Sequence, residues 1–471
     1  MLFPLPLTPF ERYMFLDDRV DYPMNMFCRL RFRGSLDVDR MYGMRDMILG
    51  RHPLSRAIIE KDRRGRLVWV DAGDATRLLR CELRPDGSFP AVDRIDLTKE
   101  PGLRAWTAVG RDESGEETSE VTFQIHHAFA DGVGALQIAH DFLLSYHAMV
   151  TGAPPEKRVL RTYQPELLRQ RMSMGLTFWK LMAILPQQSV GLAGIRQFFT
   201  RKPVPLGRDF EAPDDEAPPQ FPSALTFDLT IEETERYADA ALRSGGTVND
   251  LLVADVFATA ADWQKRFGLE SKQWLRMMTP FNLRQYADRR LPAANVVSMV
   301  FLDRTPEQIA DDAGLLRSLR EEISLIQRLN LGLTFPLVLG GMARLPGGIG
   351  MMTKKSECKS SCILTNLGEP FAKLRLPREE SGIRVGDVTL KGFDLVAPIR
   401  PLTRLALTAF RFEGRQALNL HWDARSVKRE EAVAFLEECF RRMRARLAGD
   451  ASAASPVSDE ARAAALSAEP I

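Results

Sequence analysis

Cysteine and histidine are both scarce in this chain, which has five Cys and six His in 471 residues. A sparse and odd-numbered set of cysteines does not make a disulfide framework and is typical of a reducing compartment, so we expect a cytoplasmic protein. Cys358 and Cys362 are close in sequence, but no second pair and no nearby histidine completes a zinc site. The sequence therefore predicts no bound metal.

Neither sign of charge dominates. The chain has 64 Lys and Arg against 62 Asp and Glu, a net charge of +2. Binding to nucleic acid needs a concentrated basic patch, so with this balance of charge we do not expect a nucleic-acid partner. With 45% hydrophobic and 27% charged residues, the composition is that of an ordinary soluble globular protein. Residues 1–11 lack the basic segment of a signal peptide.

Long uninterrupted hydrophobic runs are absent. Two stretches, Ser173 to Phe199 and Leu329 to Met352, are unusually apolar, but Lys180, Arg196 and Arg344 cut them below the roughly 18–20 residues that span a bilayer. One interpretation is that both are buried core helices. The other is that they form a site for a lipophilic substrate or touch a membrane surface from one side.

The common catalytic loops are also missing. The chain has no G-x-S-x-G nucleophile elbow and no Walker A loop. Gly132-Val133-Gly134 begins like a dinucleotide fingerprint, but Gln137 stands where its third glycine should be. Hydrolases that use a serine elbow, P-loop nucleotidases and dinucleotide enzymes are therefore not indicated.

What the chain does have is the stretch His126-His127-Ala128-Phe129-Ala130-Asp131-Gly132. Alternating residues before it, 121–125, predict a strand, and the apolar spacing over 133–146 predicts a helix. Side chains alternate along a strand, so the two histidines should point to opposite sides, and only one can serve a given reacting centre. A neutral imidazole is the side chain best suited to accept a proton near pH 7. The plainer alternative is a core histidine and an Asp131 that only caps the helix.

His-His-x-x-x-Asp-Gly resembles the signature of the CoA-dependent acyltransferase superfamily. Its branches include chloramphenicol acetyltransferase, peptide-synthetase condensation domains, alcohol acetyltransferases and wax ester synthase/diacylglycerol acyltransferases. The resemblance implies that His127 is the general base, while His126, Asp131 and Gly132 shape the loop. It also implies that Asp131 pairs with an arginine.

Further segments are similar to elements of the same superfamily. Residues 280–284 resemble its P-x-N-x-R element, which makes Arg284 the expected partner of Asp131 and Asn282 a candidate for substrate binding. Residues 247–250 resemble a T-x-N-D helix start, and 295–298 an N-x-x-S strand. The segment 363–368 resembles an S-N-x-G strand, with Thr365 in place of serine beside Asn366; both are candidate substrate-binding residues.

The fold that this resemblance implies is α/β, with two chloramphenicol-acetyltransferase-like lobes. Each lobe would have a mixed β-sheet with flanking helices, and a tunnel between the lobes would hold the active site. We expect an N-terminal lobe at 1–202, a linker rich in proline and acidic residues at 203–223, a C-terminal lobe at 224–448 and a disordered tail at 449–471. A break is also expected at Pro186, since proline interrupts a helix.

The function that follows is transfer of an acyl group from a CoA or carrier-protein thioester to a hydroxyl acceptor, which the apolar stretches suggest is lipophilic. The thioester is a co-substrate, so we expect no bound cofactor. One alternative is a free-standing condensation domain that forms an amide on carrier-bound substrates. Another is a non-catalytic homologue that binds a thioester or a partner. Partners would be the donor, the acceptor, a carrier protein and a membrane surface.

Overall fold

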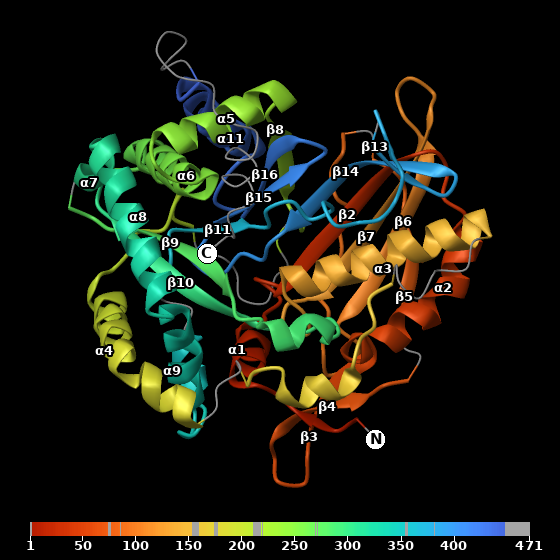
Figure 1. Cartoon of the computed structure of the whole chain (residues 1–471), viewed down its shortest axis with the longest axis horizontal. Coiled ribbons are helices and arrows are strands. Elements are labelled where there is room, and N and C mark those ends of the chain that lie inside the picture. The colour runs from red at the N-terminus through yellow and green to blue at the C-terminus, as the bar shows by residue number, and fades with distance from the viewer. Residues whose placement is uncertain are drawn as a thin grey trace.

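The computed structural model describes residues 2–73, 77–84, 86–152, 160–173, 178–210, 218, 220–268, 270, 272–353, 357–380 and 382–447. The predicted tail at 449–471 lies outside these residues, and so do 211–217 and 219 of the predicted linker. The molecule is a mixed α/β structure with two large sheets and helices around them, as predicted (Figure 1).

The first large sheet has seven strands. From edge to edge they are β12 (Arg378–Glu379), β13 (Gly382–Val385), β14 (Val388–Val396), β2 (Asn25–Arg33), β7 (Glu117–His126), β6 (Leu103–Arg111) and β5 (Arg77–Arg80). All neighbours are antiparallel except β5 and β6. The strand predicted from the alternation at 121–125 is part of β7, and the last residue of β7 is His126.

The second large sheet has six strands. Their order is β10 (Val297–Arg304), β9 (Leu275–Asn282), β11 (Cys362–Asn366), β15 (Leu405–Phe412), β16 (Arg415–Trp422) and β8 (Ala224–Asp228). β11 is parallel to both of its neighbours, and the other pairs are antiparallel. A small third sheet contains β1 (Leu5–Pro6), β4 (Leu67–Asp71) and β3 (Ala57–Lys61). Two pairs of consecutive strands, β3 with β4 and β15 with β16, form antiparallel hairpins.

Helices cover the sheets (Figure 1). On the first sheet, α2 (Val38–Arg51) and α3 (Gly132–Thr151) pack together, while α1 (Pro9–Asp17) meets α9 (Thr334–Met342) and α10 (Gly348–Met352). The second sheet is covered by α6 (Val248–Lys265), which contacts α5 (Ile231–Arg243), α7 (Pro306–Ala310), α8 (Asp312–Arg328) and α11 (Arg429–Ala445). Short 3-10 helices span Pro53–Arg56, Pro165–Gln170, Tyr286–Arg290 and Leu331–Leu333.

The first sheet contains strands from both halves of the sequence. Strands β12 to β14 come from the second half of the sequence but extend the first sheet, where β14 pairs with β2. Buried Asp394 on β14 fixes this junction, because it accepts from Arg29 at 2.8 Å and from the Thr226 hydroxyl of β8 at 2.6 Å. Burial raises the pKa of Asp394, but the neighbouring Arg31 and Arg29 and the Thr226 bond outweigh it and hold the pKa below 3.8.

The helix α4 (Phe178–Thr200) differs from its prediction, because it continues through Pro186. The Ser189 hydroxyl donates to the Pro186 carbonyl at 2.7 Å, which satisfies an acceptor in the turn that follows the proline. Among the described residues, no single helix has the length and apolar composition needed to cross a bilayer; α8 with Leu331–Met342 passes only as a pair bent by 72°.

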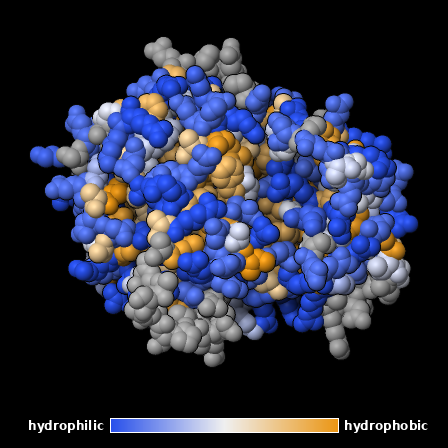
Figure 2. Space-filling model, turned by 90° about the horizontal axis from the view of Figure 1, so that it is seen from above, coloured by the Kyte–Doolittle hydropathy of each residue, from blue (hydrophilic) through white to orange (hydrophobic). Residues whose placement is uncertain are grey.

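α4 is unusual in its exposed surface. Hydrophilic residues cover most of the face seen in Figure 2, where hydrophobic ones form small separate patches. In the described part of the chain, α4 carries more exposed large apolar side chains than any other helix: Trp179, Met182, Leu185, Val190, Leu192 and Phe199. This helix therefore buries only part of its apolar surface.

Candidate active site

The two histidines lie where β7 ends and the turn before α3 begins. The backbone N–H of His126 donates to Gly102 at 2.8 Å, and that of His127 donates to Met24 at 2.7 Å. These bonds hold the end of β7 between its two neighbouring strands. The backbone positions of both imidazoles are thus determined by the sheet and not by the loop alone.

The two rings contact different parts of the molecule, as the alternation of a strand requires. His126 is fully buried; its Nδ1 accepts from the Ala128 N–H at 3.1 Å, and its Nε2 lies 3.5 Å from an Asp18 oxygen. Because Nδ1 accepts a bond, the neutral ring carries its proton on Nε2, toward Asp18. The His126 ring is therefore buried between the turn and the end of α1.

His127 remains partly exposed and lies on the side of Asn295. The buried Asn295 amide donates to the His127 carbonyl at 2.6 Å and lies 3.3 Å from its Nδ1. Burial is the largest influence on the pKa of His127 and lowers it below 6.5, against the opposing effects of hydrogen bonds to backbone and of the Asp131 charge. His127 is therefore neutral near pH 7, the state that a general base needs.

Asp131 is the N-cap of α3 and is buried. Its carboxylate accepts from the Gly134 N–H at 2.9 Å and the Val296 N–H at 2.8 Å, and from two Arg284 nitrogens at 2.7 and 2.9 Å. The expected pair with Arg284 is thus present, and the capping role of the plainer alternative is present too. With four donors on two oxygens, Asp131 joins α3 to the segments that follow β9 and precede β10.

Gly132 and Gly134 allow close contact between the loop and the second sheet. A Cβ at Gly134 would lie 2.9 Å from the Ala130 Cβ and 3.2 Å from the Ala294 carbonyl oxygen, so this position cannot carry a side chain without a shift. A Cβ at Gly132 would lie 3.3 Å from Leu367, just after β11. The segment 365–367 therefore lies beside the start of α3.

The predicted substrate-binding residues have different surroundings. Asn366 donates to Asn249 at 3.1 Å and accepts from the Gly368 N–H at 2.9 Å, so both ends of its amide are bonded within the protein. Asn282 is exposed and accepts from the Arg284 backbone at 3.1 Å. Thr365 is partly exposed, at the end of β11.

Asn295 is the residue whose role the sequence did not reveal. Its segment was recognised as similar to an N-x-x-S strand, but only the structure brings it to His127, 168 positions away in the chain. Its Oδ1 is buried and has no hydrogen-bond partner among the described residues. No group of three or more His, Cys, Asp or Glu in the described ranges is arranged to hold a metal.

Comparison with known proteins agrees with this fold. No family model matches the chain. An uncharacterized protein of Mycobacterium tuberculosis is 24% identical over 314 residues, which are 65% of this chain and 68% of that protein.

Solved structures with the same fold include the first condensation domain of the CDA synthetase, with a TM-score of 0.64 and 14% identity over 96% of this chain and 97% of that one. Polyketide synthase associated protein 5 from Mycobacterium tuberculosis has a TM-score of 0.62 and 14% identity, covering 94% and 98%. Trichothecene 15-O-acetyltransferase from Fusarium sporotrichioides has a TM-score of 0.63 and 12% identity, covering 94% of each chain. The chain thus has the fold shared by condensation domains and acyltransferases of the superfamily that its motif resembles.

Proposed function

We propose that this protein is an acyltransferase and that His127 is its general base. In the proposed reaction His127 takes the proton of an acceptor hydroxyl as its oxygen attacks the carbonyl carbon of a thioester. A C–O bond forms, the C–S bond breaks, and the proton passes from the imidazolium to the leaving thiolate. The reaction needs neither a covalent acyl-enzyme nor a metal.

The observation that carries this proposal is the contrast between two titratable groups of one loop. His127 is partly exposed and has a lowered pKa, whereas Asp131 has both oxygens occupied by Arg284 and two backbone N–H groups. The oxygens of Asp131 are therefore engaged within the protein and do not face a substrate. The imidazole is left as the group suited to accept a proton from a substrate.

The donor is an acyl thioester on CoA or a carrier protein, as the fold neighbours suggest. One of them is the starter condensation domain of rhizomide synthetase in complex with C8-CoA and Leu-SNAC. We expect the co-substrate to dissociate after each turnover and no cofactor to remain bound. Thr365 is the candidate to contact the oxyanion, whereas Asn282 and Asn366 would shape the walls around it.

We further propose that the acceptor is lipophilic and that the protein works in the cytoplasm with peripheral contact to membranes. Met182, Leu185, Leu192 and Phe199 are spaced three, seven and seven residues apart, which places them on one side of α4. An exposed apolar helix side of this kind can lie in the interfacial region of a bilayer.

A thioester-release assay with varied acceptors tests the proposal. The purified protein receives acyl-CoA or acyl carrier protein together with an alcohol, an amine or neither, and products are identified by mass spectrometry. Ester formation is the expected result. Amide formation alone would favour a condensation domain, since such domains are among the fold neighbours. Binding of thioester without turnover by any acceptor would refute catalysis.

A further inference from the structure

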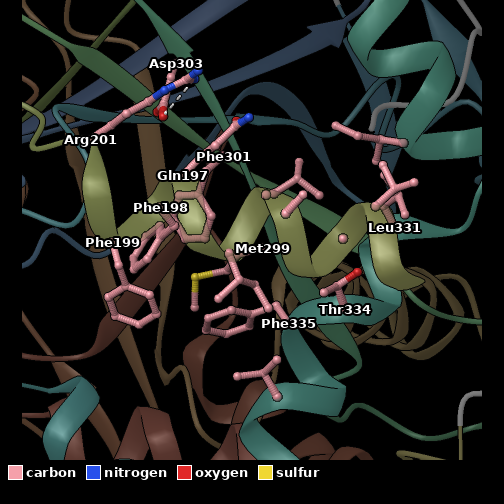
Figure 3. A pocket seen from close by; sticks show the side chains of 18 of the residues that line it. Gln197, Phe198, Phe199, Arg201, Met299, Phe301, Asp303, Leu331, Thr334 and Phe335 are labelled. Carbon is pink, nitrogen blue, oxygen red and sulfur yellow. Dashed lines mark ion pairs between the residues drawn. The ribbon is translucent and has the colours of Figure 1, made fainter. Parts of the chain in front are cut away.

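The two apolar stretches of the sequence come together around one cavity of about 350 Å³ (Figure 3). Its walls are α4 on one side and α8 with α9 on the other, and β10 forms its floor. We call this cavity the α4 groove. Small-molecule sites are typically about 300–1,000 Å³, so its size suits one slender ligand.

The floor of the α4 groove follows from the alternation of β10. Met299, Phe301 and Asp303 share one side of the strand and line the groove, whereas Leu302 on the other side packs in the core of the second sheet. Phe198 of α4 packs over Phe301, with ring centroids 4.7 Å apart (Figure 3). The floor and one wall are therefore apolar and partly aromatic.

Two glycines of α4 differ in how closely α9 approaches them. A Cβ at Gly191 would lie 2.2 Å from the Thr334 hydroxyl oxygen, so the two helices touch there. At Gly194, one turn later, a Cβ would meet nothing within 4 Å, although this residue lines the groove. The helices thus meet at one glycine and leave open space at the next.

Charged side chains gather at one end of the groove (Figure 3). Buried Arg276 bonds both Asp303 oxygens, at 2.6 and 3.0 Å, and Glu322 accepts from Arg304 at 2.7 Å. Arg201 lies 3.6 Å from the same Asp303 and stacks on Trp274, and its side chain is 31% exposed. Since Arg276 already neutralises Asp303, Arg201 is the cation of this end that can bind an additional anion.

We propose that the α4 groove binds a single-chain amphiphile with a negatively charged head, such as a fatty carboxylate. The head would contact Arg201, and the tail would lie along Phe198, Met299 and Phe335. Most of the groove's lining is apolar, so an alkyl tail that lies in it leaves water and buries apolar surface. The charged end determines which way the ligand lies in the groove. At the other end, the Thr334 hydroxyl already donates to Gln188 at 2.8 Å and so does not compete for the ligand's head.

This binding site is separate from the catalytic proposal and does not depend on it. His127 is not among the residues that line the groove. Asn295, which holds His127, lies four residues before Met299, a distance of roughly 13 Å along an extended strand.

Calorimetric titration of the full-length protein tests the proposal. The ligands are straight-chain carboxylates from hexanoate to hexadecanoate, each kept below its micelle concentration. Affinity should rise by up to about fourfold for each added methylene while the tail fills the groove. It should stop rising once the tail reaches the end of the cavity, because additional carbons then lie in water. Binding to an open apolar surface would instead rise without such a limit.

Two variants locate the site. Gly194→Leu should abolish binding by filling the open space, whereas Gly341→Leu on α9 should not change it. Both replace a helical glycine by the same residue where a Cβ meets nothing, and Gly341 is exposed and outside the groove. Arg201→Gln should weaken carboxylate binding by about tenfold and leave alkanol binding unchanged, because it removes only the charged contact.

Three results would overturn the proposal: no carboxylate binding by the wild-type chain, equal binding by Gly194→Leu and wild type, or affinity that keeps rising with chain length. His127→Ala separates this proposal from the catalytic one. It should bind carboxylates as the wild type does, so loss of acyl transfer with binding intact bears only on catalysis.

Discussion

The turn after β7 and the α4 groove hold their side chains by different means. Around the turn, Asp131 alone receives four hydrogen bonds, and Asn295 and Met24 bind the backbone of His127. The groove is shaped mainly by packing, through a glycine contact and aromatic rings, with ion pairs only at one end. Directional bonds position one reactive atom, whereas an apolar cavity selects a ligand by length and width. Substitutions should therefore have local and large effects at the turn and graded effects at the groove.

The largest expected effect comes from His127→Ala. Removing a general base typically lowers the rate by about 10²–10⁴. The ring is partly exposed, and its hydrogen-bond neighbour in the described part of the chain is Asn295, so we expect the unfolding free energy to change little. The rate of thioester release measures turnover, and urea unfolding measures the free energy of unfolding. A folded His127→Ala protein with wild-type turnover would disprove its role as base.

His126→Ala is the matched comparison. It removes a fully buried ring that accepts from Ala128 and faces Asp18, so we expect a loss of stability of about 1–3 kcal/mol together with any loss of rate. If this variant instead kept full stability and lost all turnover, the assignment of the two histidines to structural and catalytic roles would have to be exchanged.

Breaking the pair between Asp131 and Arg284 should have the next largest effect. Asp131→Asn and Arg284→Met each leave a buried polar group without its charged partner, which typically costs about 3–5 kcal/mol in a buried pair. In a double-mutant cycle, the stability lost by the double mutant should be smaller than the sum of the two single losses by about 1–3 kcal/mol. Urea unfolding of the four proteins measures this, and strictly additive losses would show that the two residues do not interact.

Acid should weaken the fold through buried neutral histidines outside the turn. Burial lowers the pKa of His140 and His421 to about 4, whereas the unfolded value is near 6.5. Between these values the unfolded chain binds more protons, so stability is complete above pH 6.5 and falls as the pH approaches 4, by up to about 3 kcal/mol per residue. Urea midpoints across this range measure the slope, and His421→Gln should reduce it. Stability that does not change from pH 6.5 to 4 would contradict this prediction.

The smallest effect is expected at the exposed side of α4. Leu192→Ser should lower retention on anionic vesicles by up to roughly tenfold, because one leucine no longer enters the interface. Ile231→Ser on α5, which is also exposed, is the control and should retain wild-type behaviour. Co-sedimentation measures both. If the wild type is not retained at all, peripheral membrane contact is wrong.

Local patterns were sufficient to predict much of the architecture. Alternation identified the strand before the histidines and the placement of the two rings on different sides, since both depend on neighbours in the sequence. Motif resemblance indicated the pair of Asp131 and Arg284. The break expected at Pro186 is absent, since α4 is one helix from Phe178 to Thr200 with the proline inside it.

Contacts between distant segments were decided only by the tertiary structure. β14 pairs with β2, and Asp394 of β14 accepts from Arg29 of β2, which lies 365 residues away in the sequence. Asn295 lies beside His127, which is 168 residues away in the sequence. Similarly, the sequence showed two apolar stretches, but whether they form core or a groove depends on how closely α4 approaches α9 at Gly191. Periodicity encodes which side of an element is apolar. It does not encode which other element covers that side, because that choice is made by packing over the whole chain.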